Sequence, residues 1–323
     1  MVAAVSTGVR AMAVRREWRR RDRTGSRAHT VSVAGSPTTV VTRTTTPART
    51  TAAAFLCAAA ALTGCGGQAA GTAADSRGGA EARTVSTAAD TLVRAGTSRV
   101  TTSMRMASGG TWLTITGSGG FDYARRRGRL TLVLPPDATG AAVHKPITEL
   151  LTPDALYMKD RGEGVPPGKW VRVDTTRLPD GNLVTGGATE PLAAAELLRG
   201  AEHVTLLGPE TLADGTRTRH YRGVADIARA AHAMQPAARG PLEAAARGFT
   251  VTRVPFDAWL DGQGRLRQVS QRFTFSSGGT AKGAGRNVTV VSTTRFDGFG
   301  APVPVTLPRP ADIWTGEIVS AQP

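Results

Sequence analysis

VPFDAWLDGQGRLRQVSQRFTF, residues 254–275, is the stretch from which the fold of this chain is predicted. Val254, Phe256, Ala258 and Leu260 recur at every second position, while Asp257 and Asp261 fall on the opposite face, a period that is typical of a β-strand with one buried face. Asp-Gly-Gln-Gly at 261–264 then indicates a tight turn into a second strand over 266–275. The stretch therefore predicts a hairpin of an antiparallel sheet.

Further strands and a few helices are predicted on both sides of this hairpin. Short runs rich in Val, Leu, Ile, Thr and aromatic residues are separated by Gly, Pro and Asp, which is typical of strands and turns, and helices are expected where apolar residues recur every three or four positions or where alanine dominates. The expected strands are 100–106, 112–116, 121–123, 130–134, 147–151, 155–159, 169–174, 203–207, 217–224 and 288–296, and the expected helices are 84–95, 191–198 and pieces of an insert over 226–248.

This order of elements predicts an α+β domain over residues 84–315, with a C-terminal tail at 316–323. The sheet is expected to be an antiparallel meander with one helix before it and two or three within it. Residues 65–83 precede the domain and contain mainly Gly, Ala and Ser, with no large apolar side chain to bury. They are therefore expected to form a flexible tether.

An apolar run at 52–62 ends in Leu62-Thr63-Gly64-Cys65. The run has the length of a signal-peptide core and is well short of the roughly 20 residues that a membrane-spanning helix needs. Arginines precede it, and the Leu-small-Gly-Cys pattern resembles the lipobox of bacterial lipoproteins. The resemblance implies that the Cys65 thiol receives diacylglycerol and becomes the mature N-terminus. The domain is then expected at the extracytoplasmic face of the cell membrane, held by this lipid anchor.

The segment before the apolar run is unusually long for a signal peptide. Residues 1–64 are interpreted as a lipoprotein signal peptide with a long disordered extension. One hypothesis is that translation starts near Val40 or Val41. An N-terminal peptide mapped upstream of residue 40 in the unprocessed protein would exclude that start.

The net charge of +15 does not indicate a nucleic-acid partner. Residues 1–64 supply +8 of it and the remainder +7, without a basic run or an interleaved aromatic patch. Arginine outnumbers lysine by 36 to 4, as a genome rich in G and C produces. A mild positive charge on an anchored domain instead favours anionic lipid headgroups.

Motifs for catalysis, metals and cofactors are missing from the sequence. Cys57 and Cys65 are the two cysteines, so nothing after Cys65 can form a disulfide or a thiolate site. The sequence contains no Gly-x-Ser-x-Gly elbow, His-Glu-x-x-His, P-loop or Gly-x-Gly-x-x-Gly opening a helix, and its histidines are scattered. We therefore predict no enzyme activity, metal or cofactor.

Several segments, in this order and spacing, carry a family resemblance: 88–106, 155–159 followed by 168–174, 208–210 with 218–221, 258–261, and 296–303. Together they resemble the actinobacterial lipoproteins related to LppX and LprG, whose fold is similar to that of the LolA/LolB lipoprotein carriers. The resemblance implies a strongly curved antiparallel half-barrel with helices over its concave face. The sequence departs from it at 177–190 and 228–247, so whether the insert at 226–248 acts as a lid stays open.

An incompletely filled half-barrel would hold an apolar ligand, because each buried CH₂ group contributes about 0.8 kcal/mol. The resemblance implies a lipid or lipoglycan ligand. The domain is expected to be a monomer and, from its charge distribution, to bind no nucleic acid. The alternative is a cell-envelope interaction protein with a filled core. Alternation identifies the apolar face of a strand but not whether the space beside it is filled. The residues expected to line a cavity are Leu92, Trp112, Ile115, Leu132, Leu134, Tyr157, Trp170, Leu197, Leu198, Val254, Phe256 and Trp259.

Overall fold

The structure is a computed structural model, and it describes residues 69–108, 111–136, 145–162, 164–276 and 287–316. The lipobox, Cys65 and the tail at 317–323 lie outside the described residues. Among the residues it describes, no helix is both long enough and apolar enough to cross a membrane.

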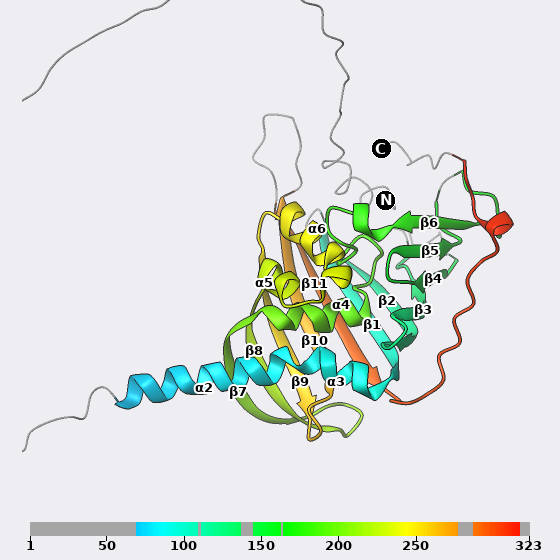
Figure 1. Ribbon diagram of the computed structural model, residues 1–323. Coiled ribbons are helices and arrows are strands. Elements are labelled where there is room, and N and C mark those ends of the chain that lie inside the picture. The colour runs from blue at the N-terminus through cyan, green and yellow to red at the C-terminus, as the bar shows by residue number, and fades with distance from the viewer. Residues whose placement is uncertain (1–68, 109–110, 137–144, 163, 277–286, 317–323) are drawn as a thin grey trace, which may run out of the picture. The chain divides into compact units, whose positions relative to one another are not determined.

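One antiparallel sheet of eleven strands forms the body of the described chain, in the order β6-β5-β4-β3-β2-β1-β11-β10-β9-β8-β7 (Figure 1). Its two edges, β6 and β7, do not pair with each other, so the sheet is strongly curved but open. The strands are β1 (Thr97–Ser108), β2 (Thr111–Asp122), β3 (Arg127–Val133), β4 (Ile147–Leu151), β5 (Ala155–Lys159), β6 (Trp170–Asp174), β7 (Ala201–Thr211), β8 (Arg217–Asp226), β9 (Arg253–Asp261), β10 (Leu266–Ser276) and β11 (Asn287–Asp297).

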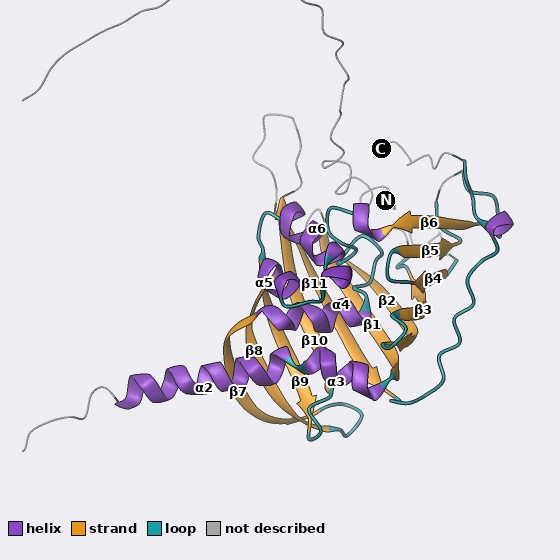
Figure 2. Ribbon diagram, in the orientation of Figure 1, coloured by secondary structure: helices purple, strands orange, loops and turns teal. Residues whose placement is uncertain are grey.

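Helices cover one face of this sheet, which we call the inner face (Figure 2). α3 packs on β1 and β10, and α4 packs on β10, while α5 and α6 pack against each other. This arrangement confirms the predicted fold class, a curved antiparallel sheet with helices over its concave face. The helices are α2 (Ala69–Ser86), α3 (Ala88–Ala95), α4 (Pro191–Glu196), α5 (Ile227–His232) and α6 (Gly240–Gly248), with short 3₁₀ turns η1 (Thr175–Arg177), η2 (Leu197–Gly200), η3 (Pro236–Ala238) and η4 (Pro310–Asp312).

Alternation along the strands decides which side chains reach the core. In β9, the even-numbered residues from Val254 to Leu260 are 0–2% exposed and belong to the core cluster on the inner face. β10 continues that face with Val269 and Phe273, and Phe273 contacts Phe249 just after α6 at a ring separation of 5.8 Å. The hairpin predicted from 254–275 is thus present, and its apolar face is the one that the helices cover.

Strand β2 is continuous where the sequence predicts two strands separated by a glycine-rich break. Its residues Gly117, Gly119 and Gly120 pair in register with β3, and a Cβ atom at Gly119 would lie 1.9 Å from the carbonyl oxygen of Arg129. Glycines therefore allow two strand backbones to approach closely here instead of turning the chain.

The segment expected to be a flexible tether is helical over Ala69–Ser86. Alanine supplies the propensity for this, and Val85, at the end of the helix, is fully buried. α2 packs along β7 and so covers part of one edge of the sheet. The folded domain therefore begins earlier than residue 84.

The opposite edge of the sheet, at β6, is covered by the C-terminal segment. Ile313 forms a parallel bridge with Trp170, and the Trp314 amide donates a 2.7 Å hydrogen bond to the Trp170 carbonyl. Lys169 also donates from Nζ to the Ala311 carbonyl at 2.7 Å. The backbone carbonyl of Trp170 at this edge is thus satisfied by the chain itself.

Neighbouring residues on β3 test this assignment of faces. Leu132 is fully buried on the inner face, whereas Val133 is 50% exposed on the outer face. Leu132→Ala should lower the free energy of unfolding by about 2–5 kcal/mol. Val133→Ala should change it by less than about 0.5 kcal/mol. Urea denaturation of both variants measures this, and equal losses would contradict the assignment.

Candidate functional site

The seven aliphatic residues predicted to line a cavity, together with Phe256, lie on the inner side of the structure. They form two areas on the sheet that are separated by β1, β11 and β10, with helix residues between. Leu134 is partly buried and packs on the core, while the others are 0–4% exposed. The set comprises Ile115, Leu132 and Leu134 near β2 and β3, Val254 and Phe256 on β9, and Leu92, Leu197 and Leu198 from the helices.

Four of the five aromatic residues predicted for the same wall, all except Phe256, lie on the outer face instead. Trp112 is 51% exposed, and the Arg105 guanidinium lies 5.0 Å from the centre of its ring. Lys159 lies 5.8 Å from the Trp170 ring in the same way. Tyr157 faces Arg172 across the register of β5 and β6, and Trp259 stacks on His220 at 4.3 Å. These rings take no part in the inner lining, because strand alternation turns them away from it.

Residues 178–190, which we call the covering loop, lie over the inner face of β2 and β3. A Cβ atom at Gly187 would lie 3.3 Å from Ile115 Cδ1 and 3.5 Å from Leu132 Cδ1. Within the loop, Leu183 is fully buried and Ala188 is 3% exposed. The covering loop thus occupies the space over the aliphatic area where a cavity was expected.

Two side chains hold the covering loop in shape. The carboxylate of Asp180 accepts hydrogen bonds from the amides of Asn182, Val184 and Thr185 at 2.7–3.1 Å. Thr189 Oγ1 donates to the Leu183 carbonyl at 2.7 Å and lies 2.7 Å from Ser292 Oγ on β11. One hydroxyl contact therefore links the end of the loop to the centre of the sheet.

A polar spot lies beneath the covering loop, inside the apolar lining. Glu149 on β4 is 1% exposed, and its neighbours in register on the inner face are Leu130 and Met158. Glu149 Oε1 and Asn182 Oδ1 are both buried without a hydrogen-bond partner. The point where a Gly186 Cβ would stand is 3.0 Å from Asn182 Oδ1 and 3.5 Å from Glu149 Oε1. The two unpartnered oxygens therefore both lie close to Gly186 of the covering loop.

Burial raises the pKa of Glu149 to about 8, and the charge of Arg161 offsets only part of that effect. Arg161 Nη1 donates instead to the Gly186 carbonyl, at 3.0 Å. At neutral pH the Glu149 carboxyl is therefore largely protonated, and the lining under the loop carries little net charge. Sequence reasoning missed this residue, although a lone Glu inside the strand ITELL, 147–151, is the signal that could have found it.

The helical cover is attached to the sheet by charged and polar contacts at its margin. Arg126, in the turn after β2, donates to both carboxylate oxygens of Glu196 on α4 at 2.7 and 3.0 Å. Burial raises the pKa of the nearby Glu190 to about 7, with Arg126 lowering it and Glu196 raising it. Gln271 Nε2 on β10 donates to the Ala194 carbonyl of α4 at 2.8 Å. These contacts fix α4 over the centre of the sheet.

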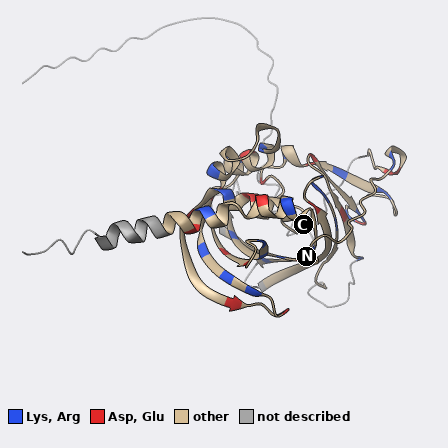
Figure 3. Cartoon of the chain, turned by 60° about the horizontal axis from the view of Figure 1, so that its bottom comes forward, with Lys and Arg blue, Asp and Glu red and all other residues tan. Residues whose placement is uncertain are grey.

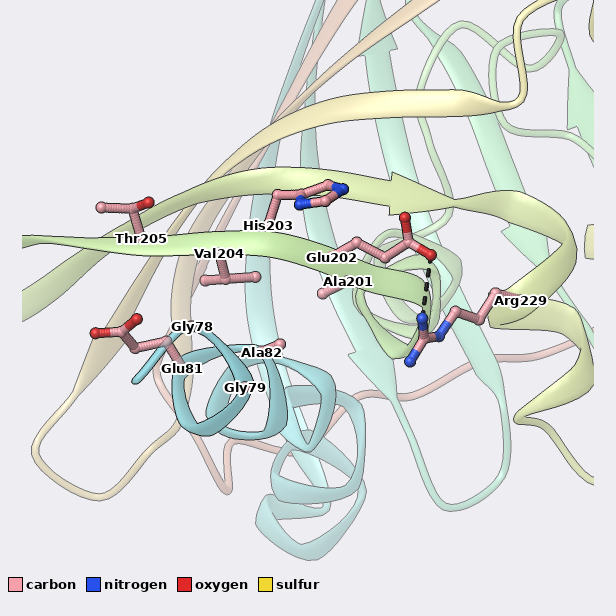
Figure 4. A pocket seen from close by; sticks show the side chains of 10 residues that line it. All are labelled: Gly78, Gly79, Glu81, Ala82, Ala201, Glu202, His203, Val204, Thr205 and Arg229. Carbon is pink, nitrogen blue, oxygen red and sulfur yellow. Dashed lines mark hydrogen bonds and ion pairs between the residues drawn. The ribbon is translucent and has the colours of Figure 1, made fainter. Parts of the chain in front are cut away.

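A groove of about 840 Å³ lies between α2 and the edge strand β7 (Figure 4). Glu202 and Arg229 form an ion pair of 3.1 Å at one end of it, and Glu81 lies at the other end. His203, on the groove, has a positive φ of 49° where the pairing of β7 with β8 shifts register. None of the twelve residues predicted to line a cavity lines this groove, and its mixed polar lining does not match an acyl chain.

Charged side chains outside these areas form local pairs. His220 lies between Asp257 Oδ1 at 2.7 Å and Glu210 Oε2 at 3.0 Å, on the outer face. Lys and Arg are spread over strands and helices in the view of Figure 3 rather than gathered in one patch. In the part of the chain that the structure describes, no cluster of three or more His, Cys, Asp or Glu side chains could hold a metal ion.

Comparison with known proteins gives similar solved structures only. No family model matches the chain, and no curated protein matches it. The lipoprotein LppX of Mycobacterium tuberculosis is 13% identical, with a TM-score of 0.40, over 70% of this chain and 98% of its own. LprF of Mycobacterium bovis is 15% identical, with a TM-score of 0.36, over 71% and 96%. A putative outer membrane lipoprotein-sorting protein domain of Vibrio parahaemolyticus is 8% identical, with a TM-score of 0.28, over 66% and 90%.

LppX, to whose relatives the sequence has a resemblance, is thus among the solved structures that this chain is similar to. Identities and scores this low transfer neither a ligand nor a residue role to this chain.

Glu149 gives a pH dependence with a definite sign. A carboxyl whose pKa is raised on folding keeps its proton in the folded chain after the unfolded chain has released it, so its contribution to stability falls as pH rises from about 5 to about 8. The loss should be at most about 1.4 kcal/mol per pH unit. Glu149→Gln should remove this slope and be more stable than the wild type at pH 8. Urea denaturation at pH 5 and pH 8 tests this, and parallel pH profiles would contradict it.

Proposed function

We propose that this chain is a lipoprotein anchored at the extracytoplasmic face of the cell membrane, where it carries a lipid or another apolar ligand on the inner face of its half-barrel. The ligand site is the aliphatic area of β2 and β3, and the covering loop occupies it in the closed form. Binding requires the loop to move away from Ile115 and Leu132. The proposal assigns no catalytic residue.

The observation that carries the proposal is the contact between Gly187 and the aliphatic wall. A glycine places no side chain among Ile115 and Leu132, so the loop covers these residues without interlocking with them. Displacing the loop at this point separates no interlocked side chains, although Leu183 and Ala188 of the loop leave the core, and an acyl chain would restore the apolar burial that is lost. Internal bonds at Asp180 preserve the shape of the loop when it moves.

A second candidate function is supported by the same inner face. Ile115, Leu132, Val254 and Phe256 are 0–4% exposed with the loop and helices in place. A core of that kind also fits an envelope protein that acts by contacting another protein or the cell wall. The two functions differ in whether the covering loop must move.

The anchor is tested with Cys65. Cys65→Ser should leave the domain folded and move it from the washed membrane fraction to the soluble fraction, because no acceptor thiol for diacylglycerol remains. Cys57→Ser is the matched control and should stay in the membrane fraction. Immunoblots of both fractions measure this, and persistence of Cys65→Ser in membranes would argue against the anchor.

The moving loop is tested with an engineered disulfide. Thr189 Oγ1 and Ser292 Oγ are 2.7 Å apart, so cysteines at both positions can join the covering loop to β11. In a Cys57→Ser/Cys65→Ser chain, the oxidised Thr189→Cys/Ser292→Cys variant should lose binding of the fluorescent fatty acid cis-parinaric acid. Dithiothreitol should restore it.

The control pair is Ser270→Cys/Thr293→Cys on the outer face, where the hydroxyl oxygens are 3.2 Å apart. Its oxidised form should bind the fatty acid as well as its reduced form does. Binding by the oxidised loop variant would refute a moving loop, and absence of binding by every variant would favour the interaction protein.

A further inference from the structure

We propose that Glu149 and Asn182 recognise a hydrogen-bond donor on the polar end of the bound lipid, a hydroxyl or a protonated amine. This inference rests on the proposed function, since it assigns a headgroup to the ligand held under the covering loop. It limits the ligand class to lipids whose polar headgroup, next to the acyl chain, carries such a hydrogen-bond donor.

The geometry supplies two buried oxygens without a partner, and a protonated Glu149 carboxyl still accepts through its carbonyl oxygen, as Asn182 Oδ1 does. Glu149 Oε1 and Asn182 Oδ1 are buried and unpartnered, and they come from different elements, β4 and the covering loop. Both lie close to Gly186 of the covering loop, so they can converge on a ligand when the loop closes over it. A buried acceptor that lacks a donor is unfavourable, so a ligand that supplies one gains affinity there.

Apolar side chains lie around the two unpartnered oxygens. Leu156 Cδ2 is 3.4 Å from the point where a Gly186 Cβ would stand, and Leu130 and Met158 flank Glu149 in register. Ile115 and Leu132 lie nearby under Gly187, the next residue of the loop. An apolar site with a few convergent polar atoms fixes the orientation of an amphipathic ligand.

Arg161 does not supply the missing donor. It donates to the Gly186 carbonyl on the backbone of the loop, at 3.0 Å. Its charge nevertheless disfavours a second cation, so the spot suits a hydroxyl better than an ammonium group.

The test compares three ligands that share a chain of the same length. Hexadecanol, hexadecylamine and methyl hexadecanoate are each used to displace cis-parinaric acid from the Cys57→Ser/Cys65→Ser chain at pH 7. Hexadecanol should displace it at about tenfold lower concentration than the methyl ester, which has no donor. Hexadecylamine separates the two donor types: tighter binding than hexadecanol assigns an ammonium headgroup, and weaker binding assigns a hydroxyl.

Two variants test whether Glu149 and Asn182 cause the preference for hexadecanol over the methyl ester. Glu149→Met removes the carboxyl at similar length, and Asn182→Gly removes the amide while keeping a residue that accepts the positive φ of 63°. In each variant, the ratio of the displacing concentrations of the methyl ester and hexadecanol should fall from about ten toward one, while the methyl ester still binds. Circular dichroism confirms that each variant is folded.

The matched control is Thr294→Val. Thr294 Oγ1 is also buried without a partner on the inner face, but its strand β11 lies four strands from β4, roughly 19 Å away. Its variant should keep the preference. Equal affinity for alcohol and ester, or an unchanged preference in the Glu149 and Asn182 variants, overturns this inference alone. Failure of all three ligands to displace the probe, or of the probe to bind, overturns the carrier proposal itself.

Discussion

An open, curved sheet must cover its apolar inner face, and the rest of this structure follows from that constraint. A closed barrel would bury this face against itself, but β6 and β7 remain separate edges. The chain therefore covers the face with α3, α4, α5, α6 and the covering loop. It protects the edges with α2 and the C-terminal segment. A cover made of short separate pieces can open in part without unfolding the sheet.

The pieces of the cover differ in how firmly they are held. α4 is held by two hydrogen bonds from Arg126 to the carboxylate of Glu196 and by one hydrogen bond from Gln271 to the backbone of α4. The covering loop instead has one side-chain link to the sheet core, at Thr189, and lies on the aliphatic wall through glycine. The strongest internal bonds of the loop, at Asp180, are to its own backbone. Of these two pieces the loop has fewer side-chain bonds to the sheet, and it is the piece that the proposed ligand would displace.

Much of the fold was predictable because strand alternation is a local signal. β4 and β5 were predicted at their observed bounds, and the hairpin of β9 and β10 within a residue or two. The same alternation places Trp259 on the strand face of Asp257, the face away from Phe256. The outer position of Trp259 could therefore have been predicted. The helix at 69–86 was missed because Gly and Ser indicated a tether, whereas packing of α2 against β7 stabilises the helix. Glu149 was missed because its unpartnered oxygen depends on a loop contact far along the chain.

The proposed lipid on the inner face under the covering loop can be detected by native mass spectrometry of the Cys57→Ser/Cys65→Ser chain, purified without detergent from a bacterial host. We expect a discrete added mass that corresponds to one lipid and extracts into organic solvent. A bare chain mass that persists after incubation with membrane lipids would contradict it.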